Sequence, residues 1–305
     1  MIDVHSHDLP DFYLAALDAA GRRPSLPNFP NWSEQGCLAL MDRFGIEASI
    51  LSVSTPGVHF GEDAAAAALA RRRNEYCDGP FDRSGGRLGA FAALPLPSID
   101  AALTEAAYAL DVLKLDGVGL FANYEGVFLG DPAFDPLLAE LDRRGAVAFV
   151  HPMGHASSRT LKLAAPLWML EYPIDTTRAA LNMIVHDVPK RFARIRFILA
   201  HAGGALPYLG GRIGASSLID PRFASLTQKS VAEDLAWFFY ETAQATSAAT
   251  FGALHEAAPM SQVLFGSDFP YCGAPAIEAM VDQLQTRFDR SAADATAKHL
   301  FPRFT

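Results

Sequence analysis

Four side chains with the chemistry of metal ligands stand at the ends of short apolar runs of the sequence: His5, His7, His151 and Asp268. His5 and His7 are two residues apart, so on a strand both point to the same face of the sheet. We expect both imidazoles to face the interior of the fold, with Val4 and Ser6 pointing outward. Neutral imidazole is the commonest metal ligand of proteins, and a carboxylate completes a set suited to a divalent ion. The four residues therefore predict a metal site with open positions for water or substrate.

A further histidine, His201, follows the apolar run Ile195–Ala200 in the same way. A lone histidine at a strand end is more often a surface or capping residue, and Gly266-Ser267-Asp268 is also a good turn sequence. It is the combination of the five residues that favours a functional site. The other histidines of the chain, which fall in predicted loops or helices, receive a structural interpretation: His59, His155, His186, His255 and His299.

These residues can meet only if the elements that carry them converge. The chain contains eight apolar runs that are candidate strands: Ile2–Val4, Ala48–Val53, Leu88–Leu94, Gly117–Phe121, Ala146–Val150, Ile195–Ala200, Ala236–Tyr240 and Gln262–Phe265. Between most of them lie segments with helical periodicity: Cys37–Phe44, Asp63–Tyr76, Ala101–Leu113, Phe134–Arg144, Ile174–Val185 and Ala276–Phe288. Continuous apolar strands that alternate with helices indicate a parallel sheet buried on both faces. Eight such repeats favour a distorted (β/α)8 TIM barrel, an α/β fold whose active site lies at the carboxyl ends of the strands.

The remaining organisation of the chain agrees with one barrel. A Rossmann fold requires a glycine-rich fingerprint after the first strand, and the segment His5–Pro10 has none. No linker rich in Gly, Ser or Pro divides the chain, so residues 1–305 are predicted to form a single domain. We expect Ala292–Thr305 to add a helix and a tail.

The composition excludes several classes of protein. The chain has 305 residues, 50% of them hydrophobic, and a formal net charge of −9. A disordered protein would be poorer in apolar residues, and a nucleic-acid surface needs a positive field. No apolar stretch approaches the length of about 18 residues that a membrane span requires. The N-terminus does not resemble a signal peptide, and the three isolated cysteines fit a reducing cytoplasm.

Several motifs, in order along nearly the whole chain, resemble the amidohydrolase superfamily. The similarity is to the branch of aminocarboxymuconate semialdehyde decarboxylase and the nonoxidative aromatic-acid decarboxylases. The motifs that carry it are Met1–His7, His151-Pro152, Ala200–Gly204, Leu264–Pro270, Leu129–Phe134, Tyr172–Ala179 and Gly203–Tyr208. Within that branch, Leu51–Gly57 and Ala109–Lys114 are most similar to 6-methylsalicylate decarboxylases.

The resemblance assigns roles to the candidate residues. It implies that His5, His7, His151 and Asp268 hold one divalent metal, usually zinc and sometimes manganese, and that His201 is an acid/base residue. Arg212, eleven residues after that histidine, matches an arginine that in these decarboxylases can reach the site of a neighbouring subunit, which implies a homodimer. A planar guanidinium suits that task because it binds a carboxylate bidentately. An ordinary surface ion pair of Arg212 is the alternative.

Two departures from the family pattern narrow the activity. The strand Gly117–Phe121 and the residues that follow it lack the lysine that bridges two metals in binuclear amidohydrolases, which favours a single metal. The segment Asp18–Trp32 is shorter than in the aminocarboxymuconate enzymes and offers only Arg22 and Arg23 as further carboxylate-binding residues. A ring acid with one carboxylate and a phenol therefore fits better than a muconate.

We expect a metal-dependent decarboxylase of a small ortho-hydroxy aromatic acid, similar to 6-methylsalicylate, that releases CO2 and a phenol. Asp268 or His201 would protonate the ring carbon, and we favour Asp268 as the donor with His201 polarising it. No nucleotide or pyridoxal motif calls for an organic cofactor. The alternatives are a hydrolase of a lactone, ester or amide, a hydratase of a dicarboxylic acid, and a barrel that binds a metal or ligand without turnover.

The remaining candidates are weaker. Phe269 is expected to contact the substrate, and other aromatic residues near strand ends are as easily core: Phe91, Phe121, Trp168 and Tyr271. Glu241 and Thr242 are interpreted either as caps or as contacts to a ligand or to the His201 ring. Asp175 has a functional interpretation by resemblance, although aspartate before a helix is first of all an N-cap.

Overall fold

The computed structural model describes residues 1–24, 26 and 29–305 and contains a closed ring of eight strands. Each strand is parallel to its neighbour, in the order in which the strands occur along the chain: β1 (Ile2–His7), β2 (Ala48–Ser52), β3 (Leu88–Ala93), β4 (Gly117–Phe121), β7 (Val147–His151), β8 (Arg196–Leu199), β9 (Phe239–Glu241) and β10 (Val263–Leu264). Bridges from Asp3 to Phe265 and from Ser6 to Phe269 join the last strand to the first. The predicted TIM barrel is therefore confirmed, with its weakest closure at β10.

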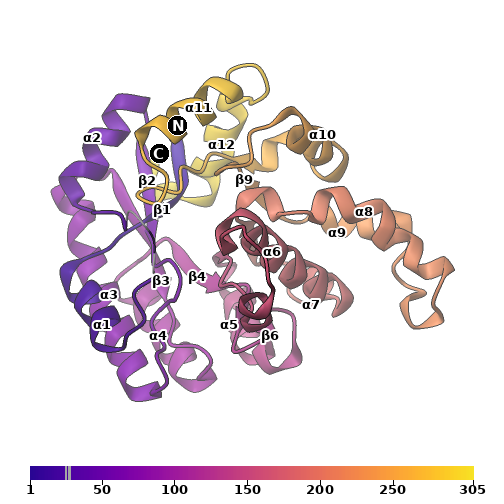
Figure 1. Ribbon diagram of the computed structural model, residues 1–305, viewed down its shortest axis with the longest axis horizontal. Helices are drawn as coiled ribbons and strands as arrows, with labels where there is room; N and C mark the ends of the chain where they lie inside the picture. The colour runs from indigo at the N-terminus through magenta and orange to yellow at the C-terminus, as the bar shows by residue number, and fades with distance from the viewer. Residues whose placement is uncertain (25, 27–28) are drawn as a thin grey trace.

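Helices surround the barrel, as Figure 1 shows. They are α1 (Asp11–Ala19), α2 (Glu34–Phe44), α3 (Asp63–Arg83), α4 (Ile99–Asp111), α5 (Asp135–Arg144), α6 (Leu167–Val185), α7 (Val188–Arg191), α8 (Leu206–Gly214), α9 (Gln228–Leu235), α10 (Ala248–Ala257), α11 (Ala274–Leu284) and α12 (Arg290–Leu300). A short hairpin of β5 (Asn123–Tyr124) and β6 (Val127–Phe128) follows β4. None of the helices in the described ranges combines the length and hydropathy needed to cross a membrane.

Two apolar layers hold the barrel together. The inner layer fills the barrel and includes Ile50, Phe91, Phe149, Ile198 and Leu264, all at most 1% exposed. The larger outer layer lies between the strands and the helices. Residues of α12 and of the chain beyond it pack against the inner layer, so the predicted C-terminal helix and tail are confirmed.

A bulge in β1 breaks the alternation that the sequence suggested. Asp3 pairs with Ser49 and Ser6 pairs with Leu51, so Val4 and His5 together stand opposite Ile50 alone. Val4 belongs to the inner apolar layer, and the expectation that it points outward is wrong. The extra residue resets the alternation, so His5 and His7 face the interior above Val4. Such bulges re-aim side chains next to active sites.

Other boundaries differ from the prediction for identifiable reasons. The strand expected at Ala236–Tyr240 begins only at Phe239, because α9 runs to Leu235 and a turn follows. Helix α6 begins at Leu167 instead of Ile174. Its first turns carry exposed apolar residues and are followed by Pro173, so they show neither an amphipathic stripe nor an uninterrupted helical sequence.

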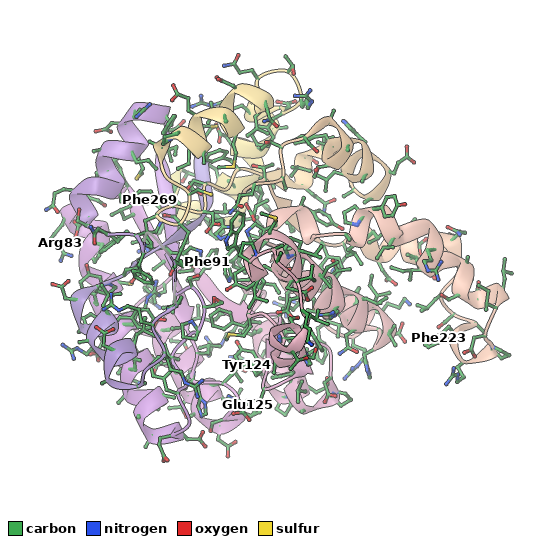
Figure 2. All side chains as sticks on the ribbon, viewed as in Figure 1. Arg83, Phe91, Tyr124, Glu125, Phe223 and Phe269 are labelled. Atoms are coloured by element: carbon green, nitrogen blue, oxygen red, sulfur yellow. The ribbon has the colours of Figure 1, made fainter. Side chains whose placement is uncertain are left out.

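Helices α8 and α9 form an arm that extends from the barrel, at the right of Figure 1. Its tip carries the short turns η4 (Ala215–Leu218) and η5 (Pro221–Phe223), and Figure 2 labels Phe223 there. Apolar side chains on the arm are open to solvent: Tyr208 is 81% exposed, Leu218 88% and Ile219 79%. An exposed apolar surface of this kind is typical of an interaction site.

Candidate active site and metal centre

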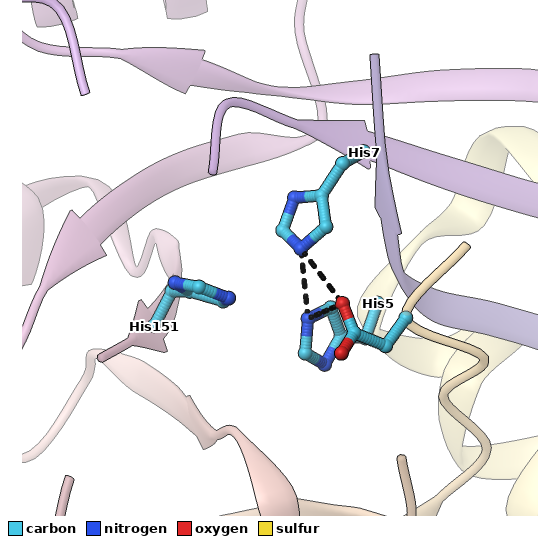
Figure 3. A group of neighbouring side chains, drawn as sticks. His5, His7 and His151 are labelled. Atoms are coloured by element: carbon cyan, nitrogen blue, oxygen red, sulfur yellow. Dashed lines mark hydrogen bonds and ion pairs between the residues drawn. The ribbon is translucent and has the colours of Figure 1, made fainter. Parts of the chain in front are cut away.

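The four predicted ligands lie together inside the mouth of the barrel. One donor atom from each of His5, His7, His151 and Asp268 falls within 4.8 Å of the others, and all four residues are buried. The Nε2 atoms of His5 and His7 are 3.0 Å apart, and Asp268 Oδ1 lies 3.4 Å and 3.2 Å from them. Figure 3 shows His151 facing this group from the opposite wall. The donors thus converge on one point from β1, β7 and the segment after β10.

Hydrogen bonds on the far side of each ring orient the three imidazoles. His5 Nδ1 is 2.9 Å from Glu241 Oε1, His7 Nδ1 is 3.2 Å from the Ser52 carbonyl, and His151 Nδ1 is 2.8 Å from the Pro152 carbonyl. Each of these oxygens is an acceptor, so the proton of a neutral ring lies on Nδ1 and the Nε2 lone pair faces the centre. This is the arrangement by which proteins prepare histidines for a metal. The donor set therefore fits a divalent cation.

The electrostatics of the centre also favour a cation. Although burial opposes charge on Asp268, the nearby His5 and the hydrogen bonds from the histidines hold its pKa well below the usual range. Burial likewise disfavours a charged His5, yet the Glu241 and Asp268 carboxylates raise the pKa of that ring to about 10. Burial lowers the pKa of His151 well below its usual range, with the neighbouring histidines adding to the effect. The buried carboxylates of Glu241 and Asp268 therefore favour a positive charge among the three imidazole rings.

His201 lies beside this centre, as the sequence predicted. Its Nε2 atom is 3.7 Å from Asp268 Oδ2, the carboxylate oxygen that faces away from His5 and His7. Its backbone N–H donates to Glu241 Oε1 at 2.5 Å, and its Nδ1 has no hydrogen-bond partner within the described ranges. The φ angles of His201 and Asp268 are 54° and 55°. Such left-handed backbone is uncommon in residues with a side chain and clusters at functional sites.

Glu241 connects the ligand group to His201. Its Oε1 bonds both His5 and the His201 backbone, and its Oε2 accepts from the Ala243 N–H at 2.6 Å. The residue accepts from backbone N–H groups, as a cap does, and it contacts the backbone of His201 and not the ring. Gly266 makes room for it, because a Cβ at that position would overlap Glu241 Oε2.

Two supporting residues escaped the sequence analysis. The Asp3 carboxylate accepts from the backbone N–H groups of His5 (3.1 Å) and Ser267 (3.0 Å) and from the Ser267 hydroxyl (2.6 Å), and so ties β1 to the turn that carries Asp268. Burial raises the Asp3 pKa to about 6, although these donors oppose the shift. Gln244 Nε2 donates to Asp268 Oδ2 at 2.7 Å. The available signal was a charged residue inside an apolar strand run, at Asp3.

Asp175 supports the loop after His151. It lies within α6 and is not an N-cap, so that interpretation is wrong. Its Oδ2 accepts from the N–H groups of Met153 (2.9 Å) and Gly154 (3.0 Å), and Asn123 Nδ2 donates to both of its oxygens at 3.0 Å. The carboxylate thus fixes the chain that leaves β7 immediately after a predicted ligand.

The predicted substrate contacts are more dispersed. Arg212 is exposed on α8, with no ion-pair partner within the described part of its own chain. The Phe269 ring packs against the cluster beneath α2 and α11, while its carbonyl accepts from the His7 N–H at 2.7 Å. Arg23 pairs with Asp18, and Arg22 is exposed. The contacts of Arg212 and Phe269 with a substrate therefore stay predictions.

The aromatic candidates separate into core and site. Phe91 stacks on Phe149 in the barrel interior, with ring centroids 5.4 Å apart, and Trp168 is 46% exposed on α6. Tyr271 lies edge-on to His7, with ring centroids 5.5 Å apart, and Phe121 lies 6.1 Å from His151 in the same sense. Only the last two border the ligand group.

A chamber of about 220 Å³ lies at the same end of the barrel, and Phe121 of its lining packs edge-on against the His151 ring. Its lining comes from the loops after β2, β3, β4 and β7, with Arg22 at its edge. The apolar residues of the lining are Pro56, Val58, Phe60, Leu94, Leu96, Pro97, Phe121 and Met153. Figure 2 labels Tyr124 and Glu125, which also line it. The mouth of the barrel therefore contains a polar ligand group and, beside it, a largely apolar space.

The barrel agrees with comparisons to known proteins. The family model described as Amidohydrolase matches residues 2–301, and the chain belongs to this family. A 6-methylsalicylic acid decarboxylase of Penicillium expansum is 36% identical over 311 residues, which cover 99% of this chain and 96% of that protein.

Solved structures show the same fold. A crystal structure of an amidohydrolase superposes with a TM-score of 0.89 at 28% identity and covers 98% of each chain. A dihydroxybenzoic acid decarboxylase of Polaromonas sp. JS666, solved with manganese and the inhibitor 2-nitroresorcinol, superposes with a TM-score of 0.83 at 19% identity. It covers 99% of this chain and 96% of that one.

Proposed function

We propose that this protein is a metal-dependent, nonoxidative decarboxylase of a small ortho-hydroxy aromatic acid of the 6-methylsalicylate type, which releases CO2 and a phenol. The observation that carries the proposal is the convergence of His5, His7, His151 and Asp268 on one point, with His201 at the outer oxygen of Asp268. The full-length similarity to a 6-methylsalicylic acid decarboxylase supports the choice of substrate.

The four donors would hold one divalent ion. Three imidazoles and one carboxylate form a set that zinc accepts well, and manganese is the alternative because a related decarboxylase was solved with it. When bound, such an ion polarises the oxygens of the substrate and orients the ring. Arrangement of the rings by Glu241, Ser52 and Pro152 gives the centre its geometry before substrate arrives. No organic cofactor enters the proposal.

The chain supplies the proton. The aryl carboxylate takes up one proton at the ring carbon that bears it, the bond from that carbon to the carboxylate breaks, and CO2 leaves while the ring regains aromaticity. Asp268 delivers this proton from Oδ2. His201 Nε2, 3.7 Å from Oδ2, is the adjacent group that exchanges it.

A homodimer would complete the substrate contacts. The arm of α8 and α9 presents exposed Tyr208, Leu218 and Ile219 on the same elements as Arg212. Burial of these side chains against a second copy would place Arg212 at the partner's site, where its guanidinium holds the substrate carboxylate. Phe269 would contact the ring.

The three cysteines are buried and free, and we place the enzyme in the reducing cytoplasm on that ground.

The proposal is tested by the products. The metal-loaded protein is incubated with salicylate-type acids, and CO2 and phenols are followed by mass spectrometry. We expect CO2 that disappears with chelator and with His151→Ala but not with His299→Ala, which removes an exposed histidine of α12. Turnover of lactones or esters without CO2 would overturn the proposal in favour of a hydrolase. Light scattering and the kinetics of Arg212→Ala test the dimer. A protein that is monomeric by light scattering, and whose kinetics are unchanged in Arg212→Ala, contradicts it.

A further inference from the structure

The chamber beside His151 has a buried apolar floor and a charged rim. Val58 and Leu94 are each 4% exposed, Leu96 is 1% exposed, and the charged Arg22 and Glu125 at the edge are exposed to solvent. A group that fills the chamber therefore contacts hydrocarbon surface at the floor and charged side chains only at the edge.

Two polar side chains of the lining already have partners within the protein. The Tyr124 hydroxyl accepts from the Phe121 N–H at 2.9 Å, and His59 Nε2 is 2.9 Å from Asp63 Oδ1. A polar substituent held against the apolar floor would lose its hydration, which is costly. An apolar substituent gains from leaving water.

The volume exceeds what one methyl group needs. A water molecule has a share of about 30 Å³ in the liquid, and a methyl group is of similar size. The chamber of about 220 Å³ therefore has room for a chain of several carbons. Apolar space that stays unfilled forfeits dispersion contacts, so a longer chain would add attraction that a methyl group cannot supply.

The chamber adjoins the ligand group through two residues. The Phe121 ring lies 6.1 Å from the His151 ring, and Met153 follows that histidine by two positions. Gly57 allows Phe121 to lie there: its φ is +76°, and a Cβ would stand 2.7 Å from the Phe121 ring. Phe121 and Met153 are thus the residues past which a substituent of a ring bound at the ligand group would enter the chamber.

We infer that this chamber binds an alkyl substituent of the ring, and that the substrate class comprises 6-alkylsalicylates with chains longer than methyl. The inference rests on the proposed function and specifies its substrate. The reaction keeps its balance: the ring carbon gains one proton, its bond to the carboxylate breaks, and CO2 and a 3-alkylphenol leave. Val58, Leu94 and Leu96 are then residues that determine specificity.

The test compares four acids on the metal-loaded enzyme: salicylate, 6-methylsalicylate, 6-propylsalicylate and 2,6-dihydroxybenzoate. One methylene in an apolar pocket changes kcat/KM by about tenfold or more, so we expect 6-methylsalicylate to exceed salicylate by at least that factor. The propyl compound should equal or exceed the methyl compound. The dihydroxy compound should fall about tenfold or more below it, because its second hydroxyl loses hydration against the apolar floor.

Two variants assign the effect to the chamber. Val58→Phe fills it, and Val112→Phe, at a 62% exposed position at the end of α4, is the matched control. The ratio of kcat/KM for 6-propylsalicylate over salicylate should fall about tenfold or more in the first variant and stay constant in the second. Metal content and thermal unfolding are compared throughout. If Val58→Phe does not fold, Met153→Phe is used instead, because Met153 is a half-buried residue of the same lining.

The outcomes separate the inference from the proposed function. CO2 from salicylate with no preference for alkyl groups, or a preference that survives filling of the chamber, overturns the inference and leaves the decarboxylase in place. A preference for a second carboxylate, held by Arg22, also overturns it. Release of no CO2 from any of the four acids overturns both.

Discussion

The mouth of the barrel has two unlike halves. In the ligand half, formed by His5, His7, His151, His201 and Asp268, each ring that is predicted to hold the metal is bonded to an acceptor on its far side. In the chamber half, hydrocarbon side chains line a space of about 220 Å³. The first half has fixed donors for chemistry that every substrate shares. The second has a shape that selects among substrates.

Left-handed backbone in residues with a side chain occurs in both halves. In the ligand half, His201 and Asp268 have φ near +55°, and at the chamber edge Glu125 has φ 52°. Such conformations cost about 1–3 kcal/mol each in residues with a side chain. Those of the ligand half persist because Glu241, Gln244 and Asp3 hold the surrounding atoms. Gly57 of the chamber half, at φ +76°, carries no such cost.

The largest expected effect is in the ligand half. Asp268→Asn keeps the size of the side chain but removes both a ligand oxygen and the proposed proton donor. We expect kcat to fall by about a thousandfold or more, since proton transfer alone contributes 10²–10⁴-fold, and the bound metal to decrease. The measurement is CO2 release together with metal analysis. Asp282→Asn on exposed α11 is the control, and near-normal turnover in Asp268→Asn would contradict the assignment.

A smaller effect is expected one shell of contacts outward, at Glu241. Glu241→Gln keeps the residue in place but weakens its hold on His5 and the His201 backbone. Loss of such a partner weakens metal binding by about 10–100-fold, which a titration with a competing chelator measures. Glu256→Gln on α10 is the matched exposed control. An unchanged metal affinity would show that the ring of His5 needs no support from this carboxylate.

In the chamber half we expect a substitution to change KM and not the metal affinity. Asp175→Asn weakens the bonds to the Met153 and Gly154 N–H groups and leaves the four ligands in place. A hydrogen bond to a charged group is worth about 1.5–3 kcal/mol, so we expect KM to rise by about tenfold and metal affinity to stay constant. Steady-state kinetics and metal titration on the same preparation decide this. Equal losses of both would show that the two halves are not independent.

The smallest expected effect is at an exposed ion pair on the surface of the protein. On α5, the hydrogen bond from Arg143 lowers the pKa of Glu140 to about 2, against an ordinary value of 4.5. The stabilisation is therefore present above pH 4.5 and is lost as the pH falls toward 2. Glu140→Gln should change the free energy of unfolding at pH 7 by less than about 1 kcal/mol, because the pair is screened by water. Denaturant unfolding at pH 7 and pH 3 checks this, and a change in substrate preference would contradict the separation of the regions.

Much of the ligand half could be predicted from the sequence. The ligands stand at strand ends, and residue type, spacing and the barrel rule are together enough to bring His5, His151 and Asp268 to one mouth. The bulge could not be predicted, because the alternation of Ile2, Val4 and Ser6 gives no sign of an inserted residue. Glu241 was noticed, but its partner depends on how β9 is placed beside β1, which only the folded barrel determines.

The chamber half could not be predicted in the same way. Its floor is assembled from Val58 and Leu94, in the loops after β2 and β3, and from Phe121, the last residue of β4, with no common spacing. The sequence does not distinguish apolar loop residues that fill a core from those that line a cavity. Asp175 illustrates the limit: its position in the sequence is typical of a cap, and its true partners lie more than twenty residues away in the loop after β7.

The central claim is that a single divalent ion, held by the four converging donors, is required for decarboxylation. The most direct measurement titrates the metal-free protein with zinc or manganese and records the rate of CO2 release from 6-methylsalicylate. We expect a linear rise that ends at one equivalent per chain and no rise in His7→Ala. A rate that needs two equivalents, or CO2 release from the metal-free protein, would contradict it.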